Sequence, residues 1–356
     1  MKKIVLIAIA LCAMMMAQGQ SDVERFVFFN RQTEKWGFMD RNGSVVVEPK
    51  YDRDEIRFNR DYIFPYNEGM AAVSVNDKWG FIDASGKMVI QPQYEGVSGF
   101  INGVAYGIDE EGNDIYFDKT GKKLKRSEAM AAIYPNTSSK IHVEITDDKY
   151  VFYNNKGEVM AEYDDWSPFS EGLARVTRGG YAAYDAMVLG AVSGYIDETG
   201  EVVIPLKFGY PANDFHDGLA AVSYCVGSVK NVWPEWKMGY IDKSGKFVIQ
   251  PLYNWAGDFK EGLALVELDH KWGFIDKQGK TVIQPQFYSA SEFIDGIAIV
   301  ENFERKISLI DKTGKMVAGY YDELLLPFKY GLALVVKGED IYYIDKTGKR
   351  VLDAVR

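Results

Sequence analysis

The chain has 356 residues and a formal net charge of −10, from 51 acidic and 41 basic side chains. A protein that binds the phosphate backbone of nucleic acids needs the opposite balance, so we expect no nucleic-acid partner. The three histidines, His142, His216 and His270, lack metal-ligand spacing, and we expect neither a metal site nor a cofactor.

Residues 1–20 are predicted to form a signal peptide. Lys2 and Lys3 precede an almost wholly apolar run from Ile4 to Met16, followed by Ala17. This run is too short for a transmembrane helix, and its length matches the core of a signal peptide. We therefore expect export to the periplasm, the outer surface or the medium, and no transmembrane segment after cleavage.

The cysteines agree with a cleaved, non-lipidated product. Cys12 lies inside the apolar run and follows Leu11, whereas a lipoprotein signal has a small residue at that place, so the sequence disfavours a lipoprotein. Removal of residues 1–20 leaves Cys225 as the single cysteine, which excludes an intramolecular disulfide.

Residues 21–356 are predicted to be a single domain built from repeats. A turn tetrapeptide recurs along the chain: Asp or Asn, then two variable residues, then Gly. Its nine copies end at Gly43, Gly86, Gly121, Gly157, Gly200, Gly245, Gly279, Gly314 and Gly348. Most are about 34 residues apart, and three repeats carry insertions.

Each copy predicts a β-hairpin. The Asp or Asn bonds forward to the backbone, and the Gly takes the left-handed conformation of a type I turn closed by a bulge. In the clearest repeat, the turn joins the alternating strand 272–276 to the β-branched strand 280–284, and a third strand, 262–266, precedes them. We therefore expect three antiparallel strands in each repeat.

A single repeat cannot fold alone. Burial of about six apolar side chains contributes roughly 1.5–3 kcal/mol each, whereas ordering about 34 residues costs roughly 1–2 kcal/mol each. Neighbouring repeats must share a core, so we predict an all-β array of about nine three-stranded antiparallel units in a β-hairpin, solenoid-like stack.

A closed, β-propeller-like array is the alternative fold. Propellers usually have about four to eight blades of four strands, which favours the open stack. A closed array would pair its first and last units, so a large separation between residues 25–29 and Val351 would exclude it.

Three segments resemble the WG (KWG) repeat family of bacterial proteins: Lys35–Phe38, Lys78–Asp83 and Lys271–Asp276, each followed by Gly-x-x-Val-[Ile/Val]-x-Pro. The resemblance runs from about Arg25 to the end of the chain. It departs at Tyr116, Tyr150, Ser308 and Tyr342, where the Trp-Gly pair is lost, and at Gly194-Tyr195 and Gly239-Tyr240, where Gly and an aromatic residue remain. The resemblance implies an exported or envelope-associated binding scaffold, with no agreed ligand or enzymatic activity.

The repeats at about 101–169 are degenerate. Within them, Ser127–Tyr134 fits one or two helical turns ended by Pro135, and a strand is the alternative.

The sequence contains no catalytic motif. It lacks a nucleophile elbow, a P-loop and a dinucleotide fingerprint. The recurring turn Asp is interpreted as structural because lysine often follows it, where a calcium repeat would place another oxygen ligand. The adjacent acids Asp164-Asp165 and Glu110-Glu111 would point to opposite faces of a strand and are interpreted as surface carboxylates. We therefore expect no enzymatic activity.

The candidate binding residues are aromatic. Trp36, Trp79 and Trp272 precede the repeat glycine and are predicted to lie in the core. Two insertions, 177–192 and 225–237, occur at equivalent places, and equivalent insertions fall on one face of an array. We predict a contact site for a protein or glycan of the cell envelope in these two loops, made by Tyr181, Tyr184, Trp233 and Trp236.

Two other functions are left open. A carbohydrate-active or other hydrolytic enzyme would need two carboxylates facing each other at about 5–10 Å, drawn from several repeats. A structural spacer would lack a contiguous apolar surface patch. The oligomeric state is not predicted.

Overall fold

A computed structural model describes residues 24–51, 66–133, 141–146, 149–154, 156–179, 190–229 and 233–355. The predicted signal peptide lies outside these residues. Contacts divide the chain into two compact parts. The terminal part comprises the residues up to 134 together with 320–356, and the middle part comprises 135–319.

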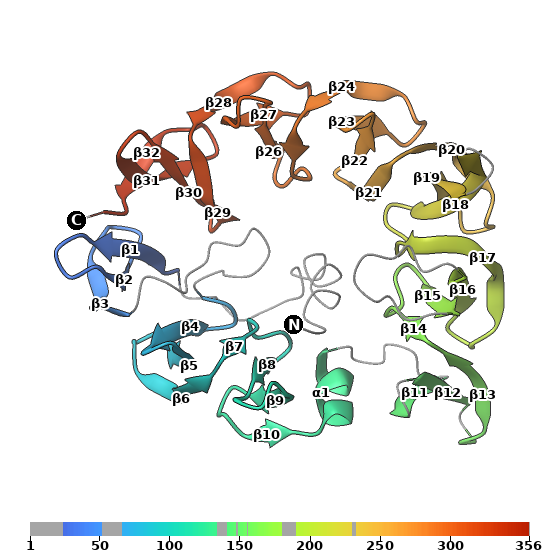
Figure 1. Ribbon diagram of the computed structural model, residues 1–356, viewed down its shortest axis with the longest axis horizontal. Helices are drawn as coiled ribbons and strands as arrows, with labels where there is room; N and C mark the ends of the chain where they lie inside the picture. The colour runs from blue at the N-terminus through green and yellow to red at the C-terminus, as the bar shows by residue number, and fades with distance from the viewer. Residues whose placement is uncertain are drawn as a thin grey trace. The chain divides into compact units, whose positions relative to one another are not determined.

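The terminal part consists of sheets whose strands follow one another in the sequence (Figure 1). Two sheets have three strands: β1 (Phe26–Asn30), β2 (Lys35–Met39) and β3 (Val45–Tyr51), then β4 (Met70–Val75), β5 (Lys78–Asp83) and β6 (Met88–Tyr94). A third has four: β7 (Gly96–Val97), β8 (Val104–Ile108), β9 (Asp114–Asp118) and β10 (Lys123–Leu124). The last also has four: β29 (Glu323–Lys329), β30 (Leu332–Lys337), β31 (Asp340–Asp345) and β32 (Arg350–Asp353).

The middle part repeats this arrangement. Its first sheet has β11 (Ile141–Thr146), β12 (Lys149–Asn154) and β13 (Val159–Tyr163). A seven-stranded sheet holds two repeats: β14 (Asp165–Trp166), β15 (Leu173–Arg178), β16 (Val192–Asp197), β17 (Val202–Ala212), β18 (Ala220–Val229), β19 (Trp233–Ile241) and β20 (Phe247–Tyr253). Two four-stranded sheets follow: β21 (Trp255–Lys260), β22 (Leu263–Leu268), β23 (Lys271–Asp276) and β24 (Thr281–Phe287), then β25 (Ser289–Ala290), β26 (Ile297–Glu301), β27 (Ile307–Asp311) and β28 (Met316–Tyr321).

One helix, α1 (Arg126–Ile133), interrupts the described strands. It forms where the sequence allowed either a helix or a strand, and its Ala129 and Ile133 are buried against Val104 and Tyr116. Within the described part of the chain we find no helical segment that could span a lipid bilayer.

The predicted turn is confirmed. At Asp276, the backbone N–H of Gly279 donates to the Asp276 carbonyl at 2.9 Å, and the Asp276 carboxylate accepts from the N–H groups of Gln278 and Lys280 at 3.0 and 2.9 Å. Gly279 has a φ of 77°, in the left-handed region that glycine favours. All nine turn glycines share this conformation.

The prediction of three strands per repeat is incomplete. Five described repeats gain a fourth strand ahead of the opening strand: β7, β14, β21, β25 and β29. Three of these are two residues long, which is too short to leave a periodic pattern in the sequence. Four-stranded units are typical of propellers, so the number of strands in a repeat no longer argues against the closed alternative.

The first and last repeats pack together within the terminal part. The Phe29 N–H donates to the Ala354 carbonyl at 2.8 Å, and the Tyr343 hydroxyl donates to the Val27 carbonyl at 3.1 Å. Phe26 meets Tyr343 edge to face, with ring centroids 5.2 Å apart. The large separation of the end repeats that would have excluded the closed alternative is therefore not found.

Consecutive repeats share one interior, as predicted. In consecutive repeats of the middle part, a loop Phe ahead of the opening strand packs on the aromatic residue of the repeat before it, with centroids 4.9 Å apart for Phe215 and Tyr195 and 4.8 Å for Phe259 and Tyr240. Turn glycines add a second contact, because a Cβ on Gly245 would lie 2.9 Å from the side chain of Ile204 in the preceding repeat.

The Trp-Gly pair has two separate roles. Trp36 and Trp79 are buried, which confirms their assignment to the core, and Trp272 is half-buried against Trp255. The glycine contacts the neighbouring strand rather than the indole. A Cβ on Gly80 would lie 2.4 Å from the Ile90 carbonyl oxygen, so the glycine lets the neighbouring strand approach closely.

Candidate functional site

The structure describes only one half of the predicted aromatic site, the segment that carries Trp233 and Trp236. Tyr181 and Tyr184 lie outside the described residues. The second insertion is a continuation of the β18–β19 hairpin, in which Val229 pairs with Trp233 and Cys225 with Trp236. The Trp236 indole covers Gly209 of β17, because a Cβ on that glycine would lie 2.3 Å from the ring. Trp236 is therefore half-buried on its own sheet rather than projecting from a loop.

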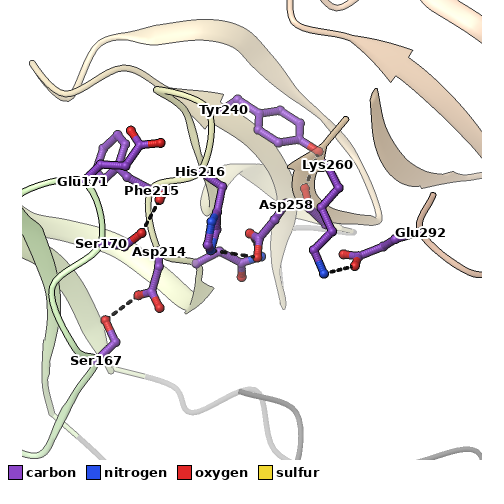
Figure 2. Close-up of polar contacts among 12 residues, drawn as sticks. Ser167, Ser170, Glu171, Asp214, Phe215, His216, Tyr240, Asp258, Lys260 and Glu292 are labelled. Atoms are coloured by element: carbon purple, nitrogen blue, oxygen red, sulfur yellow. Dashed lines mark hydrogen bonds and ion pairs between the residues drawn. The ribbon is translucent and has the colours of Figure 1, made fainter. Parts of the chain in front are cut away.

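A different set of side chains comes together in the loops before the opening strands of the middle part. Three consecutive loops place a carboxylate directly before the packed Phe: Asp214-Phe215, Asp258-Phe259 and Glu292-Phe293. Each Phe is buried and anchors its loop, so the preceding acid recurs at the same register in every repeat. Figure 2 shows Asp214, Asp258 and Glu292 one after another along these loops.

Each of these acids contacts a side chain of the preceding loop (Figure 2). The Ser167 hydroxyl donates to Asp214, and the Lys260 ammonium pairs with Glu292. His216 Nε2 lies 3.5 Å from Asp258 Oδ2. We call these residues the polar track: Ser167, Asp214, His216, Asp258, Lys260 and Glu292.

Asp258 lies at the centre of the polar track. Its side chain is 16% exposed, and its other carboxylate oxygen accepts from Asn213 Nδ2 at 2.9 Å. Burial raises the pKa of Asp258 above its usual value, and the negative charges of Glu292 and Asp214 add to this effect. His216 and the Asn213 amide oppose it but do not cancel it. A perturbed carboxyl beside a histidine is typical of functional sites, although buried structural networks also produce one.

Arg175 extends the track at its first repeat. Its position on β15 is apolar in the next three repeats, where Ala221, Leu265 and Ile299 stand. The Arg175 side chain is 12% exposed, and its Nη1 donates to Asp165 Oδ2 at 2.8 Å and to the Thr177 hydroxyl at 3.0 Å.

The carboxylates near Arg175 stabilise its positive charge. Burial by itself lowers the pKa of Arg175, but the negative charges of Asp165 and Asp214 outweigh it and keep this pKa above its ordinary value. The Arg175 backbone N–H also donates to the Ser167 hydroxyl at 3.1 Å, which joins Arg175 directly to the polar track.

The other repeated acids are structural. Glu261 precedes the opening Gly of its repeat and accepts from the Gly296 N–H at 3.0 Å and the Lys312 ammonium at 2.8 Å, both in the next repeat. Glu68 binds Gly103 and Lys119 in the same way, and Glu171 binds Gly218 and Lys243. The turn lysines therefore fasten consecutive repeats.

Asp164 and Asp165 were predicted to point to opposite faces of a strand, and they bind different partners. Asp164 accepts from Lys149 at 2.8 Å, whereas Asp165 binds Arg175.

Of the residues that the structure describes, no three His, Cys, Asp or Glu side chains form a group that could hold a metal ion.

Sequence reasoning missed the polar track although two signals were present. An acid followed by Phe recurs at Asp214, Asp258 and Glu292, in step with the repeat period. Gly172-Leu-Ala-Arg-Val176 differs from Gly262-Leu-Ala-Leu-Val266 by one arginine at an otherwise apolar register. A search for polar exceptions to the repeat pattern would have found both.

Comparison with known proteins identifies the repeat. A family model described as "WG containing repeat" matches residues 36–79, 79–106, 152–181, 194–224, 238–272, 272–302 and 307–339. The curated proteins gave no match.

Among solved structures, a eukaryotic initiation factor is similar over 93% of this chain and 95% of that one, with 13% identity and a TM-score of 0.54. BamB from Moraxella catarrhalis has 11% identity over 80% of this chain and 96% of that one, with a TM-score of 0.39. The C-terminal WD40 domain of Sif2 has 11% identity over 78% and 92%, with a TM-score of 0.40. The likeness to the initiation factor concerns the fold alone, which is of the propeller kind and agrees with the closed alternative.

Proposed function

We propose, from the premise that this chain belongs to the WG containing repeat family, that it is an exported, non-catalytic binding scaffold of the bacterial cell envelope. Its ligand is a protein or a glycan of the envelope, and its repeats present the side chains that bind it. Residues 1–20 supply the reason for export, since they have the charge and the apolar run of a signal peptide.

The polar track is the observation that carries the proposal. It places chemically similar side chains at one register of consecutive repeats, on loops whose backbone is fixed by a buried Phe. Repetition of one contact along an array suits an extended ligand, because several weak contacts add up along its length.

A hydrolytic function finds less support in these contacts. A glycoside hydrolase needs an acid and a base or nucleophile that face each other across the substrate. Asp258 and Glu292 instead face His216 and Lys260.

A capture experiment tests the binding proposal. Purified residues 21–356 are immobilised and incubated with envelope extract, beside a triple variant in which Asp214→Asn, Asp258→Asn and Glu292→Gln remove the track carboxylates. We expect the wild-type protein to retain envelope material and the variant to lose most of it. The matched control replaces three exposed acids outside the track, Glu201, Glu304 and Glu339, with Gln and should bind like the wild type.

Two results would contradict the proposal. One is the absence of any retained material with the wild-type protein. The other is a full-length chain that stays in the cytoplasm after cell fractionation, while a copy with a known signal peptide is exported.

A further inference from the structure

Arg175 has donor groups that no described residue uses. A guanidinium carries five N–H donors. Among the described residues, acceptors bind only Nη1 of Arg175, through Asp165 and Thr177. The donors on Nε and Nη2 meet no acceptor in the described part of the chain and can bind a ligand, next to a carboxylate, Asp214, whose single bond from a described residue comes from Ser167.

The charges around this point restrict what that group can be. An anion would accept from Arg175 but would be repelled by Asp165 and Asp214. An ammonium would bind Asp214 but would be repelled by Arg175, which lies close enough to Asp214 to feel its charge. A hydroxyl group accepts one hydrogen bond and donates another without bringing a charge, so it satisfies both partners.

The same pairing of donor and acceptor recurs in the next two repeats. His216 and Asn213 accompany Asp258, and Lys260 accompanies Glu292. Figure 2 shows the pairs at Asp258 and Glu292. Together with Arg175, whose charge interacts with that of Asp214, they give three sets of donor and acceptor at the repeat period. A ligand that carries hydroxyl groups at regular intervals can use the same contact in each repeat.

We infer that the polar track, with Arg175, binds the hydroxyl groups of a neutral oligosaccharide that runs across three or more consecutive repeats. This inference rests on the proposed function and names the glycan as its ligand. Arg175 anchors one sugar residue, and the pairs at Asp258 and Glu292 bind those that follow.

Calorimetry on residues 21–356 with defined ligands tests the inference. The probes are three neutral hexasaccharides (cellohexaose, maltohexaose and chitohexaose), with oligolysine and oligogalacturonate as charged counterparts. We expect at least one neutral hexasaccharide to bind, and Asp214→Asn, Asp258→Asn and Glu292→Gln each to weaken it by roughly tenfold, because each loses a charge-assisted hydrogen bond.

Arg175→Lys is the companion variant. It keeps the charge beside Asp165 but loses the planar fork of donors, so sugar binding should fall by a similar factor. Its thermal unfolding is measured in parallel, and the Glu201, Glu304 and Glu339 control should bind sugar like the wild type.

A second arm uses the natural envelope extract after digestion with protease or oxidation with periodate, which cleaves vicinal diols. Capture that survives protease and is lost after periodate supports the inference, whichever hexasaccharides bind. If protease treatment of the extract abolishes capture and periodate does not, the inference is overturned, because the ligand of the scaffold is then a protein. Binding of oligolysine without any neutral sugar overturns it in favour of a cationic protein segment.

The remaining outcomes are also decisive. Sugar binding that is equal in the wild type and the track variants overturns the inference, because the sugar then binds elsewhere. Failure of the wild-type protein to bind any probe or any envelope material removes the proposed function together with the inference.

Discussion

The terminal and middle parts use one loop in two ways. In both, an aromatic residue of the loop packs on the preceding repeat, as Phe100 does on Phe81 and Phe293 does on Phe274, with centroids 4.9 and 4.7 Å apart. The residue before the Phe is Gly99 in the terminal part but Glu292 in the middle part. The buried ring maintains the scaffold, and the neighbouring position is free to vary.

The opening strand shows the same contrast. The register of Arg175 in the middle part is occupied by Tyr106 and Leu334 in the terminal part. In both parts a loop serine accepts the backbone N–H at this register, at 3.0 Å from Tyr106 to Ser98 and 3.1 Å from Arg175 to Ser167. The backbone is therefore the same, and a few side chains distinguish the part that we propose binds the ligand.

The largest effect should come from the scaffold that both parts share. In Gly239→Ala the new Cβ would lie 2.6 Å from the Ile249 carbonyl oxygen, and backbone cannot move aside easily. We expect a loss of about 3 kcal/mol or more in the free energy of unfolding, measured by denaturant titration. Gly227→Ala is the control in the same hairpin, since its Cβ would meet nothing within 4 Å. Equal stability of the two variants would show that the close approach is unimportant.

Neutralising the track should affect binding rather than stability. The triple variant at Asp214, Asp258 and Glu292 should lose about 100-fold or more in affinity for the captured ligand, measured by calorimetry, because three charge-assisted contacts disappear. In the terminal part, Asp109→Asn and Asp114→Asn should leave the affinity within about twofold. A similar loss from both sets would remove the distinction between the two parts.

The polar contacts between consecutive repeats should contribute equally to the stability of both parts. Glu261→Ala removes the bonds to Gly296 and Lys312, and Glu68→Ala removes those to Gly103 and Lys119. Since these groups are partly exposed, each variant should lose about 1 kcal/mol in the free energy of unfolding. A loss confined to one part would show that its repeats are held together differently.

The smallest effect concerns pH. Because the pKa of Asp258 is raised in the folded protein, its ionised form is disfavoured there, and Asp258 costs stability once the pH exceeds its unfolded value, about 3.9. Asp258→Asn should therefore unfold at a higher temperature than the wild type near neutral pH, and the difference should vanish at about pH 3. Thermal unfolding at both pH values checks this. The opposite sign would mean that His216 stabilises the carboxylate more than burial disfavours it.

Local features of the fold were predictable where a residue has one physical role. The turn was identified because Asp276 and Gly279 each satisfy a specific backbone requirement. Helix α1 was recognised as one of two possibilities. The two-residue strands β7, β14 and β25 were missed, since two residues carry no period and are ordered by pairing with the next strand.

The candidate site was harder to predict. Trp236 was expected in a loop because its segment is polar, but β18 supplies it with a pairing partner and Gly209 gives its ring a surface to pack on. Asp214 and Ser167 are 47 residues apart, and no local pattern links them. Only the packing of one repeat on the next brings them together.

The sequence by itself determined the class of this protein, the period of its repeats and the conformation of its turns, because those features depend on residues close together along the chain. The tertiary structure decided that the first and last repeats pack together and that Arg175 and the polar track form one continuous set of contacts. These depend on contacts between repeats, whose partners are chosen by the shape and charge of the surfaces that meet rather than by their spacing in the sequence.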